Sequence, residues 1–173
     1  MESANSTIQC KCLSIDSHCF PEEFVKQFFS SYISLTTLLI REGSPKKLPE
    51  CGKTILVIDV DQWEIGQARK QHRCLNSTMD FATLLSTKKI LLVDAKFRVE
   101  TNELNSAFIQ YIKAKQDYTK PLFYSYLPVQ EEVILLFQTK KVEQCRNRIK
   151  RFMNNKSDIE VMDIFDFYNR YII

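Results

Sequence analysis

The chain has 173 residues, which is the size of one ordinary domain. Hydrophobic residues make up 45% of the chain and charged residues 26%, so the composition excludes a disordered protein. The 24 basic and 21 acidic residues leave a net charge of +3. Such a balance allows a nucleic-acid partner bound through a local patch but does not require one.

The glycines exclude two large enzyme classes. Only Gly43, Gly52 and Gly66 are present, so neither the G-x-G-x-x-G loop of dinucleotide-binding domains nor the G-x-S-x-G elbow of hydrolases exists here. The sequence Gly52-Lys53-Thr54 is similar to the end of a phosphate-binding loop, but Lys47 stands at that loop's first glycine position. We therefore treat this match as a chance similarity.

The sequence also lacks signals for membranes and export. No segment approaches the roughly 18 apolar residues of a membrane span, and the first twenty residues lack the apolar core of a secretory signal. We therefore expect a cytoplasmic protein that does not contact membranes and keeps its six cysteines reduced. Cys10, Cys12, His18 and Cys19 are too closely spaced for a usual zinc knuckle.

The N-terminal half predicts a short lead followed by a domain. Residues 1–20 are expected to be a weakly structured lead, and residues 21–173 a single domain with its core at about 54–153. A helix is expected to begin at Pro21 and to change into a strand near 38–40. After a loop at 41–52, the β-branched run at 54–60 predicts a buried strand, and Asp61 is expected to cap a helix over 62–74.

The C-terminal half alternates between strand and helix patterns. We expect strands at 80–85 and 90–99 around a turn at 86–89, and a helix at 102–118 capped by Asn102. A strand pair at 122–127 and 133–137, a basic helix at 140–153 and a final helix within 158–173 follow. The fold class is therefore α/β or α+β, with a central mixed sheet flanked by helices.

The predicted hairpin brings two acids and a lysine together. A turn centred on Thr87 places Asp80 directly opposite Asp94, and facing side chains lie about 5 Å apart on the same face of a sheet. Lys96 shares that face because side chains alternate along a strand. Two facing carboxylates repel unless a proton or cation lies between them. Hard oxygen ligands favour Mg²⁺ or Mn²⁺ over zinc.

These residues resemble the PD-(D/E)XK nuclease superfamily, whose motif is an Asp on one strand and (Asp/Glu)-x-Lys on the next. Asp80 and Asp94-Ala95-Lys96 match both parts, while Met79 stands where the motif has its proline. The resemblance covers roughly half of the chain and implies a restriction-endonuclease-like core. It also implies that Asp80, Asp94 and the Ala95 carbonyl bind Mg²⁺ or Mn²⁺, with Glu64 as a further acid.

The implied activity is hydrolysis of phosphodiester bonds in DNA, with RNA as the other substrate that the motif allows. Lys96 would position the attacking water and stabilise charge at phosphorus. Basic residues that could contact the nucleic acid are Arg69, Lys70, His72, Arg73, Arg98, Arg146 and Lys150. The resemblance is compatible with a homodimer or with a place in a larger complex.

Two other functions stay open. A catalytically inactive member of the fold would bind nucleic acid or a protein without cleaving it. In a plain interaction module, Asp80, Asp94 and Lys96 would form a structural charge cluster. Each basic residue also has an ordinary reading as part of a solvated surface.

Overall fold

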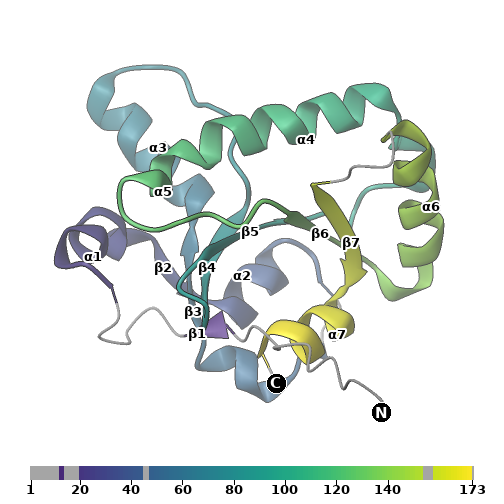
Figure 1. Cartoon of the computed structure of the whole chain (residues 1–173), viewed down its shortest axis with the longest axis horizontal. Coiled ribbons are helices and arrows are strands. Elements are labelled where there is room, and N and C mark those ends of the chain that lie inside the picture. The colour runs from purple at the N-terminus through teal and green to yellow at the C-terminus, as the bar shows by residue number, and fades with distance from the viewer. Residues whose placement is uncertain (1–11, 14–19, 45–46, 154–157, 173) are drawn as a thin grey trace, which may run out of the picture.

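The computed structural model describes residues 12–13, 20–44, 47–153 and 158–172. Strands and helices alternate along these ranges, and the helices cover both faces of one sheet (Figure 1). The α/β class with a central mixed sheet, expected from the sequence, is confirmed. Among the described helices, none combines the length and the apolar character that crossing a membrane requires.

Six strands cross the sheet in chain order from β2 to β7. Pairing is antiparallel from β2 to β5 and parallel from β5 to β7. A two-residue strand, β1 (Cys12–Leu13), pairs with β4 at residues that β3 does not reach. The other strands are β2 (Tyr32–Ser34), β3 (Leu56–Asp59), β4 (Phe81–Leu85), β5 (Ile90–Ala95), β6 (Val133–Phe137) and β7 (Ile159–Asp163).

The helices form two layers with separate apolar cores. One face of the sheet packs against α1, α3, α4 and α6, and the other packs against α2 and α7. The α-helices are α1 (Glu22–Phe28), α2 (Leu35–Arg41), α3 (Val60–Gln71), α4 (Ser106–Thr119), α5 (Pro121–Tyr124), α6 (Val142–Phe152) and α7 (Ile164–Phe167). Short 3-10 helices cover Phe29–Ser31, Glu50–Lys53, Thr101–Glu103 and Thr139–Lys141, and a π-helix covers Tyr168–Ile172.

Helix caps explain two differences from the expected boundaries. Asp59, not Asp61, caps α3, and its side chain accepts a hydrogen bond from the Gln62 backbone N–H at 3.1 Å. The helix therefore begins two residues earlier than the sequence pattern predicts. Likewise Asn105, not Asn102, caps α4, because residues 101–103 form a separate 3-10 turn.

Two expected strands are helical. Residues 38–40 lie in α2, which Ser34 caps, because leucines at 35, 38 and 39 follow helical spacing and face the sheet. Residues 121–124 form α5, in which Pro121 occupies the first helical position. Conversely, the segment from 158 begins with a strand, β7, before its helix α7. Ile159 and Val161 of this strand pack in one core and Met162 in the other, with Glu160 half-buried between them.

The expected weakly structured lead is described only in part. Cys12 and Leu13 pair with β4 through their backbones, so this piece of the lead belongs to the sheet. The expectation for the rest of residues 1–19, including the cluster of Cys10, His18 and Cys19, lies outside the described residues.

Candidate functional site

The hairpin of β4 and β5 has the register that the sequence arithmetic predicts. Phe81 pairs with Val93 and Ala82 with Leu92, so the same register sets Asp80 opposite Asp94. Ala82 and Leu92, two residues further along each strand, pack in the core beneath α4. Asp80 and Asp94 therefore project to the face of the sheet that α4 covers.

Asp80 is fixed by the backbone of the neighbouring strand. Its Oδ2 accepts a hydrogen bond from the Ala95 N–H at 2.7 Å, and its side chain is buried with only 5% of the residue exposed. This hydrogen bond uses the N–H of Ala95, and the prediction that the Ala95 carbonyl binds a metal stays a prediction. The motif's middle residue thus holds one acid in position.

Lys96 and Lys115 supply the opposite charge. The Lys96 ammonium lies 2.5 Å from Asp94 Oδ2. Lys115, on α4, lies 2.5 Å from Asp94 Oδ1 and 3.2 Å from Asp80 Oδ1. One ammonium therefore bridges both carboxylates, and the second contacts only Asp94 among the ion pairs of the described residues.

The end of α4 is anchored to the start of the hairpin. The Met79 N–H donates to Thr119 Oγ1 at 3.0 Å, and both residues are buried. Thr119 lies one helical turn after Lys115 on α4. The anchor thereby holds Lys115 over the two acids. Sequence reasoning missed Lys115, because its contact with Asp94 and Asp80 joins positions more than twenty residues apart.

The two acids have different affinities for protons. Burial, together with the negative charge of Asp94, raises the pKa of Asp80 well above its usual value. Burial also disfavours ionisation of Asp94, but the charges of Lys96 and Lys115 outweigh it, so the pKa of Asp94 is lowered. Burial likewise opposes the charge on Lys115, and the carboxylates of Asp94 and Asp80 overcome it, so the pKa of Lys115 is raised.

A third acid, Asp61, lies near this group. It occupies the first turn of α3, where its carboxylate accepts a hydrogen bond from the Thr78 hydroxyl. Burial raises the pKa of Asp61, and the charges of Lys115 and Asp94 also act on it. The sequence offered one signal for this residue, since Asp61 follows a buried strand directly.

Glu64, the acid expected to join the pair, belongs to a separate cluster. Its carboxylate receives both Nη atoms of Arg73 at 2.5 and 2.9 Å and the Tyr118 hydroxyl at 2.9 Å. The Asn76 N–H donates to it as well, at 2.7 Å. Glu64 was expected to be a further metal ligand beside Asp80 and Asp94. In the structure its buried carboxylate oxygens already accept hydrogen bonds from these other donors.

A hard divalent cation is compatible with the donors at Asp80 and Asp94. Two carboxylates that already share one ammonium can share another cation of greater charge, and Asp94 Oδ2 is buried without a hydrogen bond despite its ion pair with Lys96. In the described part of the chain, no group of three or more His, Cys, Asp or Glu side chains is arranged to hold a metal. A divalent cation would therefore have two acids as protein ligands and would compete with Lys115 for them.

The expected nucleic-acid contacts fall into two kinds. Arg69, Lys70 and His72 are exposed at the end of α3, where they are free to meet a phosphate backbone. Arg73 is held by Glu64, and Arg98 donates to the Arg41 carbonyl at 3.4 Å. These last two side chains already have partners within the fold.

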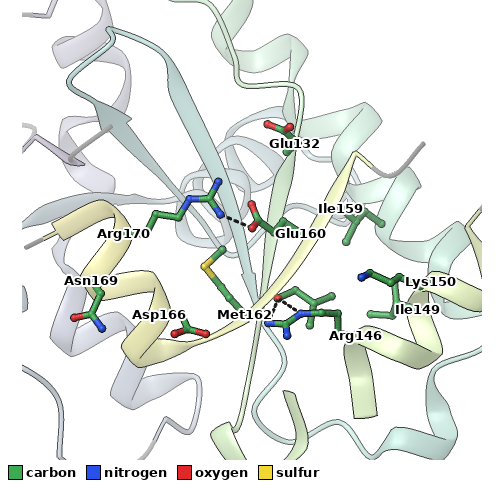
Figure 2. A pocket seen from close by; sticks show the side chains of 11 residues that line it. Glu132, Arg146, Ile149, Lys150, Ile159, Glu160, Met162, Asp166, Asn169 and Arg170 are labelled. Carbon is green, nitrogen blue, oxygen red and sulfur yellow. Dashed lines mark hydrogen bonds and ion pairs between the residues drawn. The ribbon is translucent and has the colours of Figure 1, made fainter. Parts of the chain in front are cut away.

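Arg146 and Lys150 lie elsewhere, in a pocket between α6, β7 and the C-terminal helices. The pocket has a volume of about 1240 Å³, and Figure 2 shows both side chains at its rim. Arg146 Nε and Nη2 donate to the Val161 carbonyl at 3.2 and 3.0 Å. The other charged lining residues are Arg170, Glu132, Glu160 and Asp166. The three basic side chains are thus matched in number by three acids.

Comparisons of the chain with protein-family models, with curated proteins and with solved structures returned no match.

Proposed function

We propose that this chain is a metal-dependent phosphodiesterase that hydrolyses nucleic acid, with DNA as the expected substrate and RNA as the other polymer that the motif allows. One observation carries the proposal: the carboxylates of Asp80 and Asp94 converge on one positive charge, the Lys115 ammonium, and Lys96 lies beside them. An Asp, a second Asp and a Lys in this order on a hairpin also match the motif of the PD-(D/E)XK nucleases.

The residues have distinct roles in this proposal. Asp80 and Asp94 would hold Mg²⁺ or Mn²⁺, and Asp61 would add negative charge near the cation without being one of its ligands. The bound cation supplies Lewis-acid activation of water and of the phosphoryl oxygens. Lys96, which is 12% exposed at its side chain, orients the water and offsets negative charge on the phosphoryl group.

Basic groups on the same side of the sheet are available for a polyanionic substrate. Arg69 and Lys70 are exposed in the last turn of α3 and His72 follows it, whereas Asp61 lies in the first turn of the same helix. Contacts of this kind bind phosphates without reading sequence and weaken as salt rises. We further propose a cytoplasmic location, in keeping with reduced cysteines. The proposed activity is compatible with a homodimer and with a larger complex that contains this domain.

Replacement of one acid tests the proposal. Asp94→Asn should lower Mg²⁺-dependent cleavage of DNA and RNA substrates at least about 100-fold, because it removes a charge that holds the cation. Asp117→Asn is the matched control, since Asp117 is an exposed acid on α4. Circular dichroism establishes that both variants fold. Cleavage by folded Asp94→Asn at the wild-type rate contradicts the proposal.

A second candidate function rests on Lys115. Because its ammonium already neutralises Asp80 and Asp94, the same group of charges is compatible with a catalytically inactive domain that binds nucleic acid or a protein. Calorimetric titration with Mg²⁺ and Mn²⁺ separates the two functions. Absence of metal binding at millimolar concentrations, together with retained binding of DNA, favours the inactive domain.

A further inference from the structure

Lys115 occupies the position between the two acids that a shared cation would take. Its ammonium is within 3.2 Å of an oxygen from each carboxylate, and only 4% of the residue is exposed. A buried lysine is stable only when paired. The two acids provide that pairing, and Lys115 in turn keeps them from repelling each other.

The charges of the cluster balance without a metal. Asp80 and Asp94 contribute two negative charges, and Lys96 and Lys115 contribute two positive ones. A divalent cation added to these two pairs leaves two surplus positive charges in a poorly solvated place, or one surplus charge when the nearby Asp61 is ionised. Like charges in such surroundings repel strongly. One of the ammonium groups must therefore withdraw when a divalent cation binds.

Lys115 is the group with reason to move. Lys96 contacts Asp94 alone and already reaches the edge of the cluster, whereas Lys115 lies between both acids. The Tyr111 ring, one turn earlier on α4, lies with its centroid 5.5 Å from the Lys115 ammonium. Tyr111 is 47% exposed, so this ring offers the ammonium a second partner on the side toward solvent.

We propose that Lys115 is a positioning residue that holds Asp80 and Asp94 together in the absence of metal and competes with a hard divalent cation for them. The inference rests on the proposed function. If Lys115 competes in this way, the native chain binds metal weakly. The affinity then depends on a residue of α4 as well as on the motif residues Asp80, Asp94 and Lys96.

Metal binding to four forms of the full chain tests this. Mg²⁺ and Mn²⁺ affinities are measured by isothermal titration calorimetry, and the shift of Tm with added metal is measured separately. Lys115→Met should bind Mg²⁺ at least about tenfold more tightly than wild type. It should also melt at lower temperature without metal, because the acids then repel. Lys115→Arg keeps the charge and should stay as weak as wild type.

Lys113→Met is the matched control, since Lys113 is exposed on the same helix and its loss changes the net charge equally. If Lys115→Met does not fold without metal, Lys115→Gln keeps a neutral hydrogen-bond donor and takes its place. Tighter binding confined to the neutral variants at position 115 supports the inference.

Two results would overturn it, and they are distinguishable. Equal affinity in wild type and Lys115→Met removes the role of Lys115 but leaves Asp80 and Asp94 as a metal site. No heat of binding and no Tm shift in any folded variant removes both this inference and the proposed metal-dependent activity.

Discussion

Two buried acidic sites lie on the same side of the sheet and are built differently. Glu64 is 1% exposed and receives hydrogen bonds from Arg73, Asn76 and Tyr118. Asp94 is fully buried and faces a second acid, Asp80, with lysines as their counter-ions. The donors around Glu64 lower its pKa to about 2, whereas burial and the neighbouring charge raise the pKa of Asp80.

The difference separates an acid that stabilises the fold from acids that are suited to binding. A carboxylate whose oxygens are all occupied by donors gains nothing from a further cation. Two carboxylates that face one another keep their mutual repulsion, and the fold tolerates it only through Lys115. Repulsion of this kind is a common feature of functional sites.

The largest effect in this comparison is expected at Glu64. Glu64→Gln removes the charge that pairs with Arg73, whose side chain is 28% exposed. Loss of this partly buried pair should cost about 2 kcal/mol of unfolding free energy, less than a fully buried pair would. Urea denaturation measures it, with exposed Glu23→Ala as the control. Mg²⁺ affinity should stay unchanged in Glu64→Gln; a loss of metal binding would place Glu64 in the same site as Asp94.

The contribution of Glu64 should depend on pH. Because the folded chain lowers its pKa from 4.5 to about 2, ionised Glu64 stabilises the fold fully above the ordinary value. That stabilisation is lost as the pH falls from 4.5 toward 2, where the folded state also takes up the proton. The stability gap between wild type and Glu64→Gln should therefore shrink through this window. Urea midpoints of both proteins at several acidic pH values measure it, and a constant gap contradicts the assignment.

The smallest effect on stability is expected at Asp80. In Asp80→Asn the amide oxygen still accepts from the Ala95 N–H, and Lys115 keeps Asp94 as its counter-ion. Because burial already opposes the charge of Asp80, loss of that charge offsets much of the lost ion pair with Lys115, so the unfolding free energy should change by less than about 1 kcal/mol. Urea denaturation beside Glu64→Gln decides it. An equal loss of unfolding free energy in Asp80→Asn and Glu64→Gln would contradict the proposed difference between the two sites.

Much of the hairpin could be predicted because its constraints are local. The turn between 85 and 90 fixes the register, and the register alone determines that Asp80 faces Asp94. The expected strand at 90–99 ends at Ala95, so Lys96 follows β5 directly, and its ammonium still contacts Asp94. The strands β3 and β6 followed from their β-branched and apolar runs, which are typical of buried strands.

Contacts between distant segments could not be predicted in the same way. Lys115 reaches Asp94 only because the anchor between Met79 and Thr119 fixes α4 on the hairpin. Glu64 fell outside the acid pair because Arg73, beyond the end of α3, folds back on it. Neither contact produces a pattern of neighbouring residues in the sequence from which it could be predicted. The strand wrongly predicted at 122–127 had a local cause, since its first apolar residues also fit one helical turn after Pro121.

Arg146 has a consequence for the behaviour of the protein in concentrated solution. β7 is the last strand of the described sheet, and a terminal strand offers backbone groups to strands of other molecules. The guanidinium of Arg146 occupies the Val161 carbonyl in the middle of that strand. The basic side chain of α6 thus leaves one carbonyl fewer at this edge for a strand of another molecule to pair with.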